Sequence, residues 1–210
     1  MLSVAAIVSF TALPQGKNER IFAAGIRNCV GLAVAPPSGT VRCSTNERDG
    51  LGDDVPPDYI TVREGAFYGW PWYYIGANQD SRHPNARPDL KDRITVPDVL
   101  LQAHSASLCM TFYDGAQFPA SYRGNIFAAE HGSWNRSKRT GYEVIRVIVE
   151  SGVPTGEYGD FVTGFAIRDS EVWGRPVSVT VDKGGALLVS EDGSGTIWRV
   201  SYTGKSAQSR

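Results

Sequence analysis

Short segments rich in β-branched and aromatic residues recur along this 210-residue chain, and each is bounded by glycine, proline, aspartate or asparagine. This pattern is typical of β-strands joined by turns. Helical periodicity is weak throughout; residues 93–103 come nearest to it, and Pro97 argues against a helix there. We therefore predict an all-β fold. The expected strands cover residues 4–10, 20–24, 30–35, 40–45, 59–62, 107–113, 125–129, 143–149, 177–181, 186–190 and 196–201.

Three stretches repeat the order strand, turn, strand, polar loop, strand, at residues 31–44, 109–147 and 178–200. This is the pattern of blades in a β-propeller with long and variable loops. Three such units and a leftover N-terminal strand do not close a ring. We therefore expect a partial ring of about three to four blades, whose open apolar edges allow self-association unless something completes it.

Charge and composition exclude several classes of protein. Asp and Glu number 22 against 21 Lys and Arg, so no strong field favours nucleic acid or an anionic membrane surface. No apolar run reaches the roughly 18 residues of a membrane-spanning helix. The length suits a single domain over residues 1–210.

The N-terminal residues allow two interpretations. Residues 1–13 are apolar and rich in small side chains, like the core of a signal peptide, but no Lys or Arg precedes the apolar run. The alternative is a strand at residues 4–10 followed by a Pro-Gln-Gly turn. We favour the strand, because the next segment continues as a second strand with no processing site between them.

The three cysteines, Cys29, Cys43 and Cys109, show no Cys-x-x-Cys spacing and no nearby pair of histidines, which argues against a metal–thiolate site. Cys29 and Cys43 fall on adjacent predicted strands and could pair. The odd number of cysteines argues against a disulfide framework, so we expect buried free thiols.

Polar motifs stand at three successive strand ends. Arg27 and Asn28 lead into an apolar strand, an acidic Gly-rich loop (NERDGLGDD) spans residues 46–54, and a Gly-Trp-Pro corner follows at residues 69–71. Loops from neighbouring blades converge at the mouth of a propeller, so these motifs suit a polar site there.

The order of these motifs resembles the glucose/sorbosone dehydrogenase family of quinoproteins, which includes L-sorbosone dehydrogenase-like proteins. The resemblance covers most of the chain, from about Val4 to Tyr202. It implies a six-bladed propeller that holds pyrroloquinoline quinone (PQQ) and calcium, with this chain matching its C-terminal half to two-thirds and a periplasmic or secreted location. The matching motifs lie at residues 7–10, 20–28, 46–54, 68–71, 112–115, 131–136 and 174–200.

The resemblance implies residues that contact the quinone. Arg27 and Asn28 match a pair at the quinone edge, and Arg175 matches an arginine that clamps a quinone carboxylate. A second family arginine is replaced here by Trp173. The alternative for Arg27 and Asn28 is that they cap and shape a turn.

Two further positions are candidates for cofactor binding. Arg136 is a replacement cation for an expected lysine, or equally a solvated hairpin residue, and His104 falls near a family position that contacts the cofactor. None of the three histidines, His83, His104 and His131, matches the catalytic histidine of the family, which belongs to an earlier blade. We therefore expect the catalytic base to be absent from this polypeptide.

The acidic loop is the candidate calcium site. Carboxylates and backbone carbonyls on a flexible turn are ligands that calcium accepts. By resemblance, the backbone carbonyls around Arg48 and Asp49 would hold the ion, and Asp53 or Asp54 would support the loop. An acidic turn without a metal is the alternative.

These motifs favour an oxidoreductase that transfers hydride from a sugar, aldose or sorbosone-like aldehyde to PQQ with the help of calcium, and then passes electrons to an external acceptor. The second hypothesis is a non-catalytic, truncated propeller that acts as a binding or interaction module. A calcium-dependent hydrolase of the lactonase type ranks last, because the acids cluster in one loop instead of converging from several blades.

Overall fold

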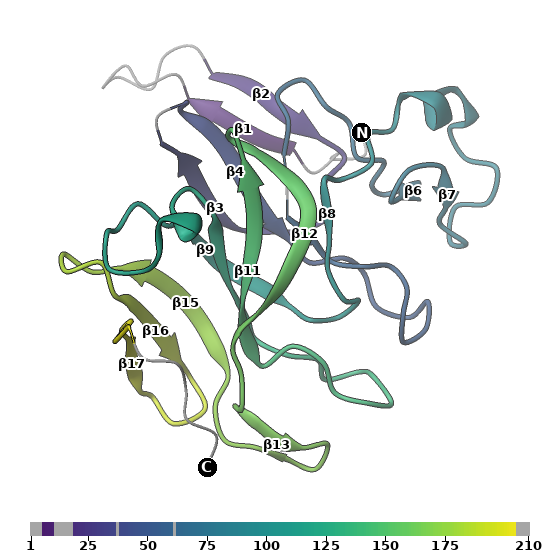
Figure 1. Cartoon of the computed structure of the whole chain (residues 1–210). Helices are drawn as coiled ribbons and strands as arrows, with labels where there is room; N and C mark the ends of the chain where they lie inside the picture. Colours follow the sequence, from purple (N-terminus) through teal and green to yellow (C-terminus); the bar gives the residue numbers. More distant parts are fainter. Residues whose placement is uncertain (1–5, 11–18, 37, 61, 205–210) are drawn as a thin grey trace.

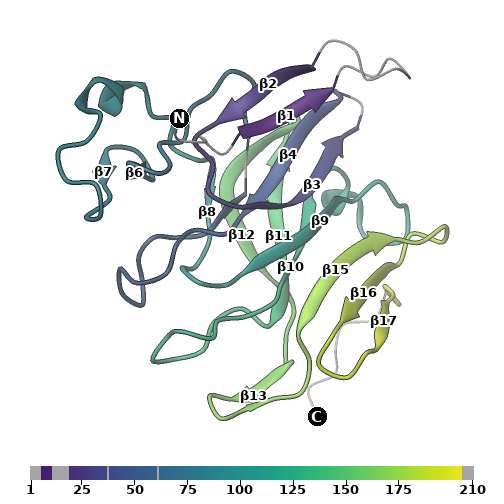
Figure 2. The same cartoon turned by 180° about the vertical axis from the view of Figure 1, so that it is seen from behind.

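Antiparallel sheets make up the described part of the chain, which confirms the all-β prediction (Figures 1 and 2). The computed structural model describes residues 6–10, 19–36, 38–60 and 62–204. Within these ranges the helical segments are two short 3-10 helices, η1 (Pro88–Arg93) and η2 (Ala120–Tyr122). None of the helices in this part of the chain is long and apolar enough to cross a membrane.

Three larger sheets follow one another along the chain, and in each of them consecutive strands lie side by side. Smaller two-stranded sheets flank them. Sheet I has β3 (Cys29–Ala35), β4 (Thr40–Thr45), β5 (Tyr59–Ile60) and β8 (Val99–Leu100), and sheet II has β9 (Ser107–Phe112), β10 (Ile126–Glu130), β11 (Glu143–Glu150) and β12 (Val153–Val162). Sheet III has β15 (Pro176–Val181), β16 (Leu187–Glu191) and β17 (Ile197–Val200). The two-stranded sheets pair β1 (Ala6–Phe10) with β2 (Glu19–Ala24), β6 (Tyr73–Tyr74) with β7 (Asn78–Gln79), and β13 (Ala166–Arg168) with β14 (Glu171–Val172).

Sheet II lies between sheets I and III, and its first strand, β9, contacts both β3 and β15. Apolar side chains fill the space on each side of sheet II. All five residues of β10 are buried, because Ile126 and Ala128 face the core shared with sheet I while Phe127 faces the core shared with sheet III. Burial on this scale, at roughly 25 cal/mol per Å² of apolar surface, holds the sheets face to face.

Glycine at position 31 lets β3 approach β9 closely. A Cβ atom there would overlap the carbonyl oxygen of Leu108, and the backbone N–H of Gly31 donates to Ser44 Oγ at 3.2 Å. Any larger residue would push the first strands of sheets I and II apart, together with the loops that precede them.

The strand predictions are confirmed within one or two residues where the structure describes them, as β1 to β5, β9 to β11 and β15 to β17, whereas the short strands β6, β7, β8, β13 and β14 were not predicted. Residues 4 and 5 lie outside the described residues. The segment at residues 93–103 is not a helix: η1 ends at Arg93, and β8 follows. The sequence pattern missed β12, whose Pro154, Gly156 and Gly159 disfavour a central strand but are tolerated at the edge of sheet II.

The expectation of free thiols at Cys29 and Cys43 is wrong, because the two form a disulfide, whereas Cys109 is free and half-buried. Cys29 pairs with Thr45 and Cys43 with Leu32 in the β3–β4 register, so the cysteines lie diagonally across two neighbouring strands. Their Cα atoms are 5.8 Å apart, within the range that a disulfide spans.

One row of apolar side chains on sheet I is uncovered. Val30, Leu32 and Val34 on β3 are 41%, 59% and 60% exposed. In the β3–β4 register, Leu32 and Val34 lie opposite Cys43 and Val41 of β4, and these two pack in the core beneath β2. The uncovered row therefore belongs to the same face of sheet I, which the β1–β2 pair covers only in part.

We expect loss of the disulfide to destabilise the chain. The bond closes a loop with a sequence separation of 14 residues, for which chain entropy gives a stabilisation of about 3 kcal/mol. Replacing both Cys29 and Cys43 by Ser should lower the free energy of unfolding by about 2–3 kcal/mol in urea titrations. Cys109→Ser is the matched control. An unchanged midpoint in the double variant would contradict the prediction.

Candidate functional site

Polar residues from sheets I and II line a cavity of about 120 Å³. Arg27 and Asn28 precede β3, Asn46 and Glu47 follow β4, His104 precedes β9, and Trp134 and Asn135 lie in the loop after β10. The second strand of an antiparallel pair returns to the end where the first began, so these loops meet at one edge. In Figures 1 and 2 the loops after β4 and β10 extend on the same side of the molecule.

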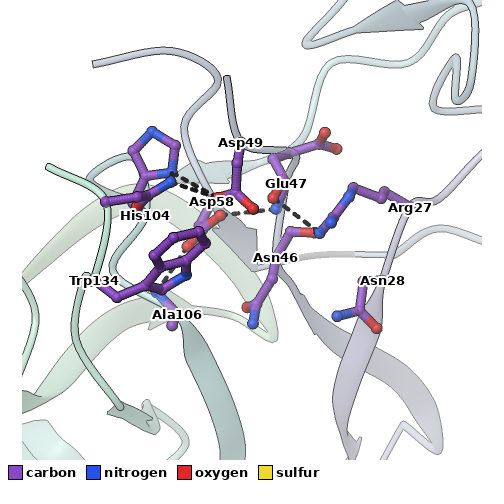
Figure 3. Close-up of a pocket in the computed structure, with 10 residues that line it drawn as sticks. Arg27, Asn28, Asn46, Glu47, Asp49, Asp58, His104, Ala106 and Trp134 are labelled. Atoms are coloured by element: carbon purple, nitrogen blue, oxygen red, sulfur yellow. Dashed lines mark hydrogen bonds and ion pairs between the residues drawn. The ribbon is translucent and has the colours of Figure 1, made fainter. Parts of the chain in front are cut away.

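Arg27 joins the start of β3 to the end of β4. Its Nη1 donates to the backbone carbonyls of Asn46 and Glu47, each at 2.9 Å, and the guanidinium lies 5.9 Å from the centre of the Trp70 ring. Asn28 is exposed and lines the same cavity (Figure 3). Arg27 therefore shapes the loop that follows β4, in agreement with the alternative that it caps and shapes a turn. It also lines the cavity.

Asp58 is a buried carboxylate at this site that sequence reasoning missed. Its Oδ1 accepts the backbone N–H of Glu47 at 2.8 Å, and its Oδ2 accepts that of Ala106 at 2.9 Å. Burial raises the pKa of Asp58 to about 6, although these two bonds favour the charged form. The only sequence signal was its position directly before an apolar strand.

Glu47 is a second carboxyl group with altered acidity. Burial raises its pKa to about 7, and a hydrogen bond from the backbone N–H of Arg48 and the charge of Arg27 oppose this shift. Its Oε2 is buried without a hydrogen-bond partner. Both Glu47 and Asp58 therefore change charge close to neutral pH, which is common at functional sites.

His104 is buried, and both of its ring nitrogens are engaged. Nε2 lies 2.9 Å from the carbonyl oxygen of Gly52, which can only accept, so Nε2 carries the proton. Nδ1 then accepts from the Asn135 amide at 3.3 Å, and the same amide donates to Asp49 at 2.6 Å. Asp49 Oδ1 lies 3.4 Å from Nδ1. Figure 3 shows His104 and Asp49 side by side at one end of the cavity.

The other acids of the predicted calcium loop bind a neighbouring loop. Asp53 accepts the backbone N–H of Ser137 and is bonded to its hydroxyl, while Asp54 pairs with Arg136 at 2.9 Å. Arg136 also donates to the carbonyl of Ala103 at 3.1 Å. These side chains tie sheet I to sheet II beside the cavity and do not line it.

Arg48 is buried in an ion pair with Asp80, with Nε 2.8 Å from Oδ2, and Arg82 shares the same carboxylate. Arg48 Nη1 donates to the backbone carbonyl of Asp49 at 3.2 Å. Among the described residues, no group of three or more His, Cys, Asp and Glu side chains is placed to hold a metal ion. Of the four residues predicted around calcium, only Asp49 lines the cavity.

A second cavity, of about 290 Å³, lies at the start of sheet III and contains Arg175. Arg175 Nη2 donates to His131 Nδ1 at 3.1 Å, and His131 Nε2 lies 3.0 Å from Asp192. Arginine and aromatic side chains dominate the lining, which has no acidic residue. It consists of Trp134, Arg139, Tyr142, Val172, Trp173, Arg175 and Gly193.

Trp134 belongs to both cavities and is 77% exposed, so the cavities are neighbours that meet at this ring. The structure thus brings Arg27, Asn28 and His104 together in the first cavity and places Arg175 in the second. The sequence analysis did not select Trp134 and Asn135 as site residues. The available signal was their position in a loop directly after a predicted strand, like the other loops of the site.

The comparisons with known proteins agree with this architecture. A family model described as TrAA12-like matches residues 77–203, more than half of the chain. The chain belongs to the TrAA12-like family. This confirms the resemblance to quinoprotein sugar dehydrogenases that the order of motifs indicated.

The similar proteins are longer than this chain. An uncharacterized protein of Borreliella burgdorferi is 39% identical over 191 residues, which is 89% of this chain and 50% of that protein. The family AA12 carbohydrate-active enzyme of Trichoderma reesei, solved in iodide and calcium structures, has in the iodide structure 21% identity and a TM-score of 0.69, covering 84% of this chain and 53% of that one. The holo PQQ domain of Coprinopsis cinerea pyranose dehydrogenase has 20% identity and a TM-score of 0.65, covering 89% and 56%. The chain thus spans about half the length of these relatives.

The raised pKa of Asp58 predicts a pH dependence of stability. An acid whose folded pKa lies above its unfolded value stabilises the fold at low pH, and this contribution is lost as the pH rises through the folded value of about 6. Between pH 7 and pH 4 the wild type should gain roughly 2 kcal/mol relative to Asp58→Asn. Urea titrations across this range measure the difference. Parallel curves for the two proteins would contradict the prediction.

Proposed function

We propose that this chain is part of a PQQ-dependent sugar dehydrogenase. The observation that carries the proposal is the meeting of two cavities at Trp134, one containing Arg27 and the other Arg175. Guanidinium groups on two sides of an exposed aromatic ring suit a planar molecule that carries several carboxylates.

Sheets I, II and III are proposed to be blades of a β-propeller. Each sheet is a meander that begins with a strand in contact with a neighbouring sheet, as β9 contacts β3 and β15. The loops before these first strands carry Arg27, His104 and Arg175, so an arrangement around a central axis would turn all three toward it.

The residues of the second cavity fit the quinone. Arg139 and Arg175 supply positive charge, and Trp134, Tyr142 and Trp173 supply flat apolar surface. Arg175 Nε is buried without a hydrogen-bond partner, so it has a donor free for a carboxylate. When bound, PQQ would accept hydride from the substrate. Arg175 would hold and orient it in the second cavity, and Arg27 would contact only its edge from the first cavity.

The first cavity fits a hard cation better than it fits a polyanion. It carries the carboxyl groups of Glu47, Asp49 and Asp58 against the single guanidinium of Arg27. Buried oxygens of Asn46, Glu47 and Asn135 lack hydrogen-bond partners. Calcium takes carboxylate and amide oxygens, so its proposed site lies beside Asp49 and not at Asp53 or Asp54. The acidic side chains of the described residues are not grouped to hold the ion by themselves, so backbone carbonyl and amide oxygens would have to complete the ligand set.

The substrate is proposed to be an aldose or a related aldehyde such as sorbosone, oxidised with an external electron acceptor. Both ring nitrogens of His104 are engaged, so the catalytic base is proposed to lie outside the described residues. The disulfide between Cys29 and Cys43 favours an oxidising compartment such as the periplasm.

Equilibrium dialysis against PQQ in the presence of calcium tests the proposal. Loss of one charge-assisted contact should weaken binding roughly 10- to 100-fold in Arg175→Ala, with a smaller loss in Arg175→Lys. Arg168→Ala is the matched control, because Arg168 is exposed on β13 and pairs with Glu171. Addition of an aldose to the complex should change the absorbance of the bound quinone.

Two outcomes would count against the proposal. If the wild type retains no PQQ with calcium present, the cofactor assignment is lost and the non-catalytic binding module becomes the better description. If Arg175→Ala and Arg168→Ala bind PQQ equally well, the second cavity is not its site.

The exposed row of Val30, Leu32 and Val34 favours a role in assembly, and we propose that it is covered by a second copy of this chain. Sedimentation should show a dimer that dissociates in Leu32→Asp, while Val96→Asp, an exposed apolar residue elsewhere, leaves it intact. A monomer at all concentrations would contradict this.

A further inference from the structure

The backbone of Arg175 is held by two acidic residues at the point where β16 ends. A carboxylate oxygen of Glu191 accepts the backbone N–H of Arg175 at 3.2 Å, and the backbone N–H of Asp192 donates to the carbonyl of Arg175 at 3.1 Å. Glycine at position 193 allows this close approach, because a Cβ atom there would lie 3.0 Å from the carbonyl oxygen of Trp173. The backbone before β15 is therefore fixed against the turn that follows β16.

A histidine from the neighbouring sheet holds the side chain of Arg175. His131 follows β10, and its backbone N–H donates to the carbonyl of Ala106 at 3.0 Å. Its Nε2 lies 3.0 and 3.1 Å from the two carboxylate oxygens of Asp192, so Nε2 carries a proton and donates it. Arg175 Nη2, which can only donate, lies 3.1 Å from Nδ1, so Nδ1 accepts. The imidazole is thus neutral and bonded at both nitrogens.

This arrangement differs from a direct ion pair such as that of Arg199 on β17, whose Nε lies 2.7 Å from Asp182. A direct pair offsets the charge of an arginine and occupies its donors. Arg175 instead reaches the carboxylate of Asp192 through the neutral ring of His131, and within the described part of the chain it forms no ion pair of its own. The ring therefore orients the guanidinium while its charge stays available.

The available charge faces the second cavity. Neither His131 nor Asp192 lines this cavity, so they act on a ligand there only through Arg175. Arg175 Nε is buried and has no hydrogen-bond partner, and Arg139 adds a second guanidinium to the lining. One bond at Nη2 thus holds the side chain and leaves a charged donor for a carboxylate.

We propose that His131 and Asp192 are positioning residues, which hold Arg175 in the second cavity without cancelling its charge and so reserve its guanidinium for a flat aromatic carboxylate. The carboxylate of such a ligand would bind Arg175, and its ring would lie against Trp134 or Trp173. The use of this site for PQQ rests on the proposed function, whereas the positioning of Arg175 does not.

Asparagine and aspartate at position 131 separate orientation from charge. The two side chains have the same shape, and both offer an oxygen that accepts from Arg175. His131→Asn leaves the charge of Arg175 available, whereas His131→Asp places a carboxylate directly against it. We expect His131→Asn to bind an aromatic carboxylate within about threefold of the wild type, and His131→Asp to bind it at least roughly tenfold more weakly. If His131 only ties sheet II to sheet III, the two variants should bind equally.

Nuclear magnetic resonance of the cofactor-free chain measures this binding with phthalate, a flat aromatic dicarboxylate, in buffer without calcium. The Nε–H signal of Arg175, identified by its absence in Arg175→Lys, should shift as phthalate is added and so gives the dissociation constant. The Nε2–H signal of His131 should be visible in the wild type and lost in Asp192→Ala, because its proton then exchanges with water. His83→Asp adds an acid in a loop that lines neither cavity and is the matched control, expected to bind as the wild type does.

Three results would overturn the proposal: an Arg175 signal that does not respond to phthalate, equal affinities of His131→Asn and His131→Asp, or a His131 Nε2–H signal that is unchanged in Asp192→Ala. Slow exchange of the buried β10 amides shows that each variant is folded. PQQ binding is measured separately by equilibrium dialysis. If the wild type binds phthalate at Arg175 but retains no PQQ, the proposed function fails and the positioning role stands.

Discussion

One buried carboxylate is hydrogen-bonded to the backbone on both sides of the candidate site. Asp58 accepts the backbone N–H of Glu47, which follows sheet I's second strand, and that of Ala106, which precedes sheet II's first strand. Ala106 has a positive φ of 56°, an uncommon conformation for a residue other than glycine, and its hydrogen bond to Asp58 helps to hold it. The Asn46 and Glu47 carbonyls that receive Arg27 are set by the same contact, so the shape of the cavity depends on Asp58.

The acids of the loop at residues 46–54 divide between two surroundings. Asp53 and Asp54 bind Ser137 and Arg136 of the next sheet's loop, which leaves Asp49 facing the cavity. Charge is thereby divided between the two cavities: carboxyl groups and unpaired oxygens collect in the first, and arginines with aromatic rings in the second. An anion and a cation would each find a separate place on either side of Trp134.

Local pattern predicted most of the fold, because strand composition and turn residues act over a few positions. It predicted β4 to the residue and placed Arg27, Asn28 and Arg175 at strand ends. It missed the disulfide between Cys29 and Cys43, which depends on the register of β3 against β4, and it missed Asp58, whose role depends on backbone groups 11 and 48 positions away. A single sequence does not show which residues far apart in the chain come into contact.

The proposed oxidation would release a hydride and a proton, and the division of charge suits both. A hydride needs an acceptor held in place, which guanidinium groups provide because they keep their charge at every accessible pH. For the same reason arginine cannot take up a proton. Carboxyl groups with pKa values near neutrality can, and Glu47 and Asp58 of the first cavity have them. In the proposed function, the arginine-rich cavity would therefore hold the acceptor of the hydride, and a proton would be taken up only on the acidic side of Trp134.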